Sequence, residues 1–156
     1  MDRITYDMLK EVGACSSKLE SFAAVFPAGA PISMESVYRA IEGGLDLRFA
    51  ARLVPDGERA IFDETVTIME GVYDMAIAPA CQRRNEMTGP AWEAYKRIVA
   101  VRGDIALARV ERDTAIDEPT RRCHEVMAAA FRVYLAGFGL ALVVALTRGV
   151  SDGKEE

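Results

Sequence analysis

A repeat of eleven residues constrains this chain more than any other sequence feature. Cut every eleven residues, the stretch 60–103 gives the aligned units AIFDETVTIME, GVYDMAIAPAC, QRRNEMTGPAW and EAYKRIVAVRG. The third position of the units holds Phe62, Tyr73, Arg84 and Tyr95, so only the third unit breaks an aromatic column. Eleven residues make about three helical turns, so one helix face stays aligned from unit to unit. The repeat therefore predicts a long amphipathic helical segment on which the rest of the chain packs.

Prolines inside the repeat decide how this helical segment is divided. An interior proline removes a backbone hydrogen bond and costs about 3 kcal/mol, so Pro79 is expected to kink the helix. Thr88-Gly89-Pro90 is a stronger stop, because a cap residue and a breaker precede a proline that a first helical turn tolerates. We therefore expect two helices, about 58–86 and 90–112, packed as an antiparallel hairpin. One bent helix is the alternative.

The first arm of this expected hairpin is apolar over a broad face. The spacing of one set of residues predicts the packing seam: Ile61, Thr65, Ile68, Val72 and Ala76. A second set lies beside the seam and widens it: Val66, Met69, Tyr73 and Ile77.

Several short helices are expected before the repeat. Thr5 can cap a helix over 6–12, Ser17-Lys-Leu-Glu20 has the form of a capping box, and Ser33 can cap a third helix. The segment 45–54 fits both the alternation of a strand and the spacing of a helix. Its adjacent alanines, and the lack of a second alternating run in the chain, favour a helix.

The C-terminal part is expected to form one apolar helix. A polar connection, 113–117, precedes a helix over 117–148 that carries Pro119 in its first turn. From Val133 to Thr147 no residue is charged, but a membrane span needs about twenty such residues and Arg132 blocks the extension. We therefore expect a buried core helix or an oligomer interface rather than a membrane span.

Together these elements predict an all-α fold. It is a helical bundle built on a long antiparallel helical hairpin, with short N-terminal helices and an apolar C-terminal helix. The length suits a single domain over 1–150. Its expected parts are short helices in 1–56, the hairpin in 57–113 and the C-terminal helix in 117–148, followed by a solvated tail, 151–156.

No pattern of catalytic or metal-binding residues is evident. The sole histidine, His124, stands between Cys123 and Glu125, and adjacent residues on a helix point in different directions. A helical two-metal site would need Glu-x-x-His, but Arg121 occupies the position three residues before His124. We therefore expect no enzyme activity, no cofactor and no metal.

The cysteines and the N-terminus indicate the compartment. Cys15, Cys81 and Cys123 are far apart in sequence and lack zinc-ligand spacing, so we expect reduced thiols. The charged stretch 1–12 does not have the form of a secretory signal. A cytoplasmic protein is the expectation.

Charge gives the candidate binding site. The chain has 24 acidic and 19 basic residues and a net charge of -5, which argues against direct nucleic-acid binding. Acidic residues gather in one window in which Arg59 is the only base: Asp56, Glu58, Asp63, Glu64, Glu70 and Asp74. The window is either a solvated helix face or an acidic patch for a basic partner surface.

Four stretches resemble a family of small proteins of unassigned function from phages and bacterial mobile elements. Leu9-Lys-Glu-Val-Gly-Ala-Cys15 is similar to the family's opening phrase, and Leu45–Leu53 to a following segment with aromatic residues. Ala78-Pro-Ala80 and Pro90-Ala-Trp-Glu-Ala-Tyr95 are similar to the family's eleven-residue Ala-Pro-Ala-x-x-Ala-Tyr repeat. The resemblance covers residues 9–110. The chain departs from the family at Arg84 and in its apolar C-terminal helix.

The resemblance implies a mobile-element origin and supplies no catalytic residues. Small acidic phage proteins often bind and block a host machine, as anti-CRISPR proteins do, and this analogy gives the leading hypothesis. The chain would inhibit a host nucleic-acid-handling defence complex, a protein or ribonucleoprotein, through the acidic helix face. The alternative is a structural protein that self-assembles into a homo-oligomer, as a virion or scaffold component. A membrane-active protein, based on 133–147 alone, is a third hypothesis.

Overall fold

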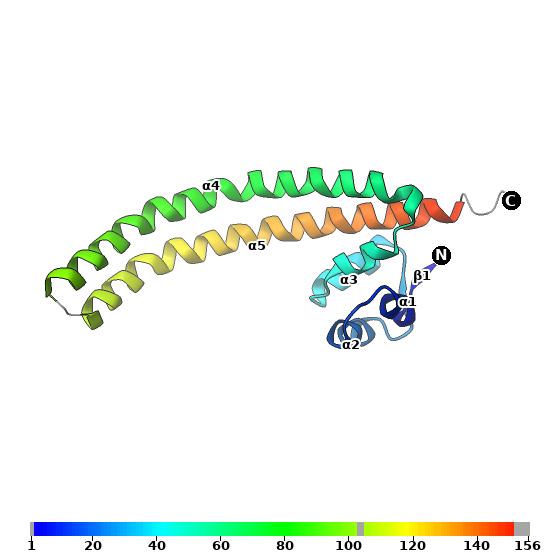
Figure 1. The fold of residues 1–156 in the computed structure, drawn as a ribbon, viewed down its shortest axis with the longest axis horizontal. Coiled ribbons are helices and arrows are strands. Elements are labelled where there is room, and N and C mark those ends of the chain that lie inside the picture. Colours follow the sequence, from blue (N-terminus) through cyan, green and yellow to red (C-terminus); the bar gives the residue numbers. More distant parts are fainter. Residues whose placement is uncertain (1, 103–104, 152–156) are drawn as a thin grey trace. The chain divides into compact units, whose positions relative to one another are not determined.

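The computed structural model describes residues 2–102 and 105–151, and they are mostly helical (Figure 1). The elements are β1 (Arg3–Ile4), α1 (Tyr6–Glu11), α2 (Ser16–Val25), β2 (Ala30–Pro31), α3 (Met34–Glu42), the 3₁₀ helix η1 (Leu47–Leu53), α4 (Asp56–Arg102) and α5 (Ile105–Ser151). The predicted fold class is confirmed, because short N-terminal helices accompany a long packed pair, α4 and α5, whose second member is apolar. Of the predicted tail, only Ser151 lies within the described residues.

The chain divides into two compact units. The first contains residues up to Gly71 together with those from Arg132 onward, and the second contains Val72–Phe131. Each unit holds a part of α4 and a part of α5.

Two of the predicted helix caps are confirmed in the first unit. The Thr5 hydroxyl oxygen accepts a hydrogen bond from the backbone N–H of Met8 at 3.3 Å, at the start of α1. The Ser33 hydroxyl oxygen accepts one from Ser36 N–H at 3.3 Å, at the start of α3. Such bonds satisfy N–H groups that have no partner within the helix.

The predicted capping box at the start of α2 is wrong. Cys15, not Ser17, occupies the N-cap position, and its side chain makes no capping bond. The helix begins two residues earlier because the Cys15 carbonyl already accepts bonds from the N–H groups of Lys18 and Leu19, at 3.0 and 3.1 Å. The Ser17 hydroxyl instead lies 3.4 Å from the Cys15 sulfur.

The segment that fitted both strand and helix is helical, as favoured, but of the tighter 3₁₀ type. Arg59, in the first turns of α4, covers the end of η1: its guanidinium donates to the carbonyls of Ala51 at 2.7 Å and of Val54 at 3.0 Å. The strands β1 and β2 pair antiparallel, with Arg3 opposite Pro31. Each has two residues, too few for an alternating pattern to predict them.

The core of the first unit forms where the short helices pack on the C-terminal part of α5 (Figure 1). Leu146 is 1% exposed and belongs to the same buried cluster as Phe22 of α2 and Val37 of α3. Gly139 permits the close approach of α3, because a Cβ atom there would lie 2.2 Å from a methyl carbon of Val37. Phe62 of α4 meets Phe138 of α5 edge to face, with ring centroids 5.5 Å apart.

The predicted helix break at Thr88-Gly89-Pro90 is wrong. α4 runs without interruption from Asp56 to Arg102, with Pro79 and Pro90 inside it, so the alternative of one helix is the one observed. Both prolines are exposed. Water can therefore solvate the carbonyls that lose their hydrogen-bond donors, and packing along the rest of a long helix offsets the remaining cost.

The predicted polar connection at 113–117 is also wrong, because α5 passes through it and through Pro119. Ion pairs three or four residues apart suit a helix surface rather than a loop. Arg122 donates to Glu118 at 2.6 Å, and Arg121 donates to Glu125 at 2.7 Å. The polar residues that suggested a connection are one exposed side of a helix.

These two corrections change the arms of the hairpin. α4 ends at Arg102 rather than at Pro90, α5 begins at Ile105, and most of the expected second arm is divided between these two helices. α4 and α5 are therefore the antiparallel arms. In the second unit, Tyr73 meets Phe131 with ring centroids 6.1 Å apart.

The predicted seam of the first arm is rotated by about one residue. In the first unit Ile61 and Ile68 are 54% and 61% exposed, whereas Phe62 is 4% exposed and Val66 and Met69 pack against the core. Both apolar stripes have helical spacing, so the sequence alone did not distinguish them. The contact with α5 selects the stripe that carries the aromatic ring.

Candidate functional site

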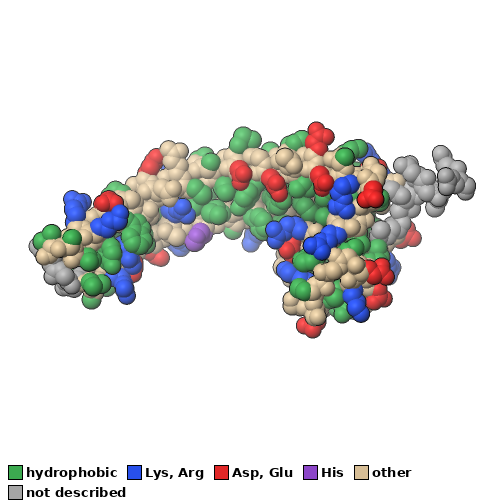
Figure 2. Space-filling view, in the orientation of Figure 1, with side chains coloured by type: hydrophobic (Ala, Val, Ile, Leu, Met, Phe, Trp, Pro, Cys, Tyr) green, Lys and Arg blue, Asp and Glu red, His purple; other side chains and the backbone are tan. Residues whose placement is uncertain are grey.

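The six acidic residues of the predicted patch all lie on α4. Asp56, Glu58, Asp63, Glu64 and Glu70 belong to the first unit, and Asp74 belongs to the second. All except Glu58 are exposed. Figure 2 shows acidic side chains in a row along α4.

Helix geometry separates the five residues of the first unit. Asp56, Asp63 and Glu70 follow one another at intervals of seven, so they share one side of α4 with a drift of only about 20° per interval. Glu64 lies about 100° around the helix from Asp63, at the edge of this side. Glu58 lies roughly 200° around the helix from Asp56 and is half-buried. The structure therefore brings together Asp56, Asp63, Glu64 and Glu70, which we call the acidic stripe, and leaves Glu58 out.

No carboxylate of the acidic stripe forms an ion pair within the described residues. None of the ion pairs found in residues 2–102 and 105–151 includes one of its carboxylates. Arg59, the one base in that sequence window, directs its guanidinium to backbone carbonyls of η1. The acids on this side of α4 outnumber the one base, Arg59, and none of them is held in an ion pair within the described chain.

One end of the stripe reaches the contact between α4 and α5. The Tyr134 hydroxyl donates to a carboxylate oxygen of Glu70 at 3.5 Å. Burial raises the pKa of Tyr134 above its usual value, the Glu70 charge raises it further, and the guanidinium of Arg48 opposes them. The tyrosine thus stays protonated and available as a donor to Glu70.

The acidic stripe offers electrostatic attraction rather than a reaction. Exposed carboxylates on a helix can meet lysine and arginine side chains of a partner, and salt weakens such contacts within a Debye length of about 10 Å at 0.1 M. Its members are all carboxylates, with no serine, cysteine or histidine among them. His124, on α5, is exposed and belongs to the second unit.

Sequence reasoning missed a pair of thiols in the second unit. The sulfur atoms of Cys81 on α4 and Cys123 on α5 lie 3.8 Å apart. Burial raises the pKa of Cys123, and the neighbouring Cys81 raises it further, so this thiol is protonated and unreactive at neutral pH. The pair was not predictable while the hairpin turn was placed at Pro90.

The described residues contain no group of three or more histidine, cysteine or carboxylate side chains placed to hold a metal ion. Cys15 is exposed, and a hydrogen bond from the Ser17 hydroxyl is the main cause that lowers its pKa.

α5 is the one described helix that is long and apolar enough to cross a membrane, judged by length and composition. Over Ile105–Arg148 its most apolar window has a mean hydropathy of 2.0, and 33% of that window is buried inside the protein. The core helix of a soluble protein can have the same properties. Part of this apolar surface packs on the short helices, as Leu142 and Leu146 show.

Comparisons of the chain with protein-family models, with curated proteins and with solved structures find no match. The resemblance to the phage and mobile-element family therefore depends on the sequence motifs alone.

Proposed function

We propose that this chain is a non-enzymatic interaction protein that binds a basic surface of a host nucleic-acid-handling defence complex and blocks it. The acidic stripe supplies the binding surface in the first unit, and Asp74 is a further exposed acid of α4 in the second unit. The observation that supports the proposal is the excess of acidic residues: these carboxylates are exposed, and no described base pairs with them. A surface that binds nucleic acid is basic, so an acidic helix can compete for it.

The mechanism is steric and electrostatic. Charge complementarity steers the encounter and favours one orientation of the two surfaces. A rigid helix keeps successive carboxylates at fixed spacing, which limits the entropy lost on binding. The blocked complex would lose access to its nucleic acid without any covalent change.

The test is capture of bacterial proteins on the tagged full chain, identified by mass spectrometry. The wild type is compared with a variant in which Asp63, Glu64, Glu70 and Asp74 are changed to lysine. We expect the wild type to retain a nucleic-acid-handling complex in stoichiometric amount, and the variant to lose it while keeping its helix content by circular dichroism.

A second variant controls for net charge. Glu11, Glu20, Glu42 and Asp117 are also exposed acids but lie on other helices, and changing them to lysine alters the net charge equally. We expect this control to keep the complex. If both variants lose it to the same extent, binding follows overall charge and α4 is not the binding surface.

The alternative, self-assembly, is favoured by a separate observation in the first unit. Large apolar side chains are exposed on the helix pair: Ile68 at 61%, Val133 at 73% and Leu140 at 52%. Exposed apolar surface often marks contacts between chains. The molar mass of the pure protein in solution, from light scattering, distinguishes the two. A stable closed oligomer and no captured host protein would favour the structural role over inhibition.

A further inference from the structure

The first unit contains a cavity of about 100 Å³ between its short helices and α5. Most of its wall is apolar and is contributed by α2, α3, η1 and α5. The principal wall residues are Phe22, Phe26, Val37, Ala40, Ala50 and Leu142. Small molecules bind preferentially in concave apolar sites that contain a few polar groups, and this cavity has that form.

The size and lining indicate the kind of molecule that fits. An apolar cavity of about 150 Å³ stays dry and takes up benzene. The cavity here is about two-thirds as large and is open at one side, where a ligand could extend outward. A compact hydrocarbon group, of the size of one small ring, therefore suits the wall.

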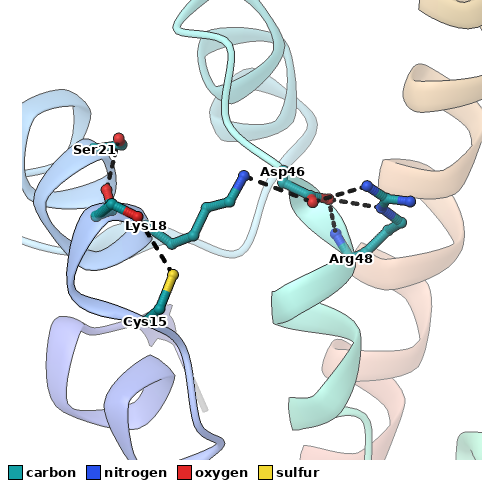
Figure 3. Close-up of polar contacts among 6 residues, drawn as sticks. Cys15, Lys18, Ser21, Asp46 and Arg48 are labelled. Atoms are coloured by element: carbon teal, nitrogen blue, oxygen red, sulfur yellow. Dashed lines mark hydrogen bonds and ion pairs between the residues drawn. The ribbon is translucent and has the colours of Figure 1, made fainter.

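The lining contains two charged residues, one of each sign. It includes Lys18 of α2 and Asp46, which precedes η1 (Figure 3). Asp46 accepts two bonds at 2.9 Å from the guanidinium of Arg48 and one at 3.1 Å from the Arg48 backbone N–H. This guanidinium is the main cause that lowers the pKa of Asp46. Asp46 is thus already compensated by Arg48, and Lys18 adds one positive charge.

Lys18 is held only loosely. Its ammonium nitrogen lies 3.8 Å from Oδ2 of Asp46, and its side chain is 45% exposed. Figure 3 shows Lys18 reaching across from α2, while Arg48 lies on the other side of Asp46, toward α5. An incoming carboxylate can therefore pair with Lys18 while Asp46 keeps its stronger partner, Arg48.

We propose that this cavity binds a small monocarboxylate, with its hydrocarbon body in the apolar cavity and its carboxylate paired with Lys18. The site is distinct from the acidic stripe, and the proposal is independent of the proposed function. It requires a hydrocarbon group and a negative charge in the same ligand.

Benzoate and its neutral analogue benzamide test both requirements on the full chain. Titrations are followed by the backbone amide resonances of Val37 and Leu142 and by the melting temperature. We expect benzoate to shift these resonances and raise the melting temperature, and benzamide to bind about tenfold more weakly, the equivalent of one modest ion pair. If neither compound shifts them at millimolar concentration, the proposal is wrong.

Three variants sharpen the test. Lys18→Gln should reduce benzoate affinity to that of benzamide, whereas Lys10→Gln, at an exposed lysine outside the cavity, should not change it. Ala40→Val narrows the cavity and should weaken the binding of both compounds. If this variant does not fold, Ala50→Val, in η1, narrows the cavity in its place. If Lys18→Gln and the wild type bind benzoate equally, the carboxylate pairing is wrong.

Discussion

The two units of the chain use the same two helices in different ways. In the first unit, sixteen buried residues from the short helices, α4 and α5 form one cluster. In the second unit, the described buried apolar residues are Ala108, Pro119 and Cys123. Both units expose large apolar side chains, in the second unit Met75 at 70% and Val110 at 63%, but only the first also has a large buried cluster.

The difference shows what the short N-terminal helices contribute when they pack on the pair of long helices. Two helices bury one stripe each, whereas the short helices of the first unit cover a second side of α5. The second unit depends more on contacts along its surface, such as Arg112 against Trp92 and Tyr95. We therefore expect the second unit to open at a lower free energy than the first.

The largest expected effect tests the core of the first unit. Leu146→Ala removes a side chain that is 1% exposed, so it should lower the free energy of unfolding by about 2–5 kcal/mol. Leu140→Ala, on the same helix but 52% exposed, should cost less than about 1 kcal/mol. Urea denaturation followed by circular dichroism measures both. Equal losses would mean that the short helices do not form the core on α5.

An intermediate effect tests the close approach of α3 to α5. Gly139→Ala places a methyl group 2.2 Å from Val37, and relief of this clash should cost about 1–3 kcal/mol. Gly71→Ala is the matched control on α4, because no atom lies within 4 Å of the added carbon. It should stabilise the helix by roughly 0.5–1 kcal/mol. The sign of the change in melting temperature distinguishes the variants, and a stabilising Gly139→Ala would contradict the contact.

The sequence predicted the short helices better than the long ones, for a physical reason. The caps Thr5 and Ser33 act on backbone groups three residues away, so the information they carry is local. Whether the helix breaks at Pro90 depends on two free energies: the cost of one lost hydrogen bond and the gain from packing along the whole of α4. Which stripe of α4 packs inward is likewise decided by α5, a partner that the local pattern does not identify.

The candidate site was predictable in composition but not in geometry. The window 56–74 identified every residue of the acidic stripe, because an excess of one charge is visible in the sequence. The window also contains Glu58, which the structure places on another side of α4 and half-buried. The thiol pair and the cavity depend on contacts between segments that are distant in sequence, so no local sequence pattern predicts either of them.

The smallest expected effect tests the second unit alone. The guanidinium carbon of Arg112 lies 4.6 Å from the ring centre of Trp92 and 4.8 Å from that of Tyr95, and its side chain is 15% exposed. Arg112→Met keeps much of the apolar stem but removes the charge, so it should cost about 0.5–2 kcal/mol. Arg109→Met, at an exposed arginine one turn earlier, should cost less than about 0.5 kcal/mol.

Trp92 makes this effect measurable in the second unit, because it is the only tryptophan in the chain. Its fluorescence reports on the second unit, whereas circular dichroism reports on all the helices. We expect Arg112→Met to move the fluorescence transition to lower urea and to separate it from the later part of the dichroism transition. If the two transitions stay coincident in the wild type and in both variants, the units unfold together. In that case the dense core of the first unit stabilises the second as well, and the difference in burial has no counterpart in stability.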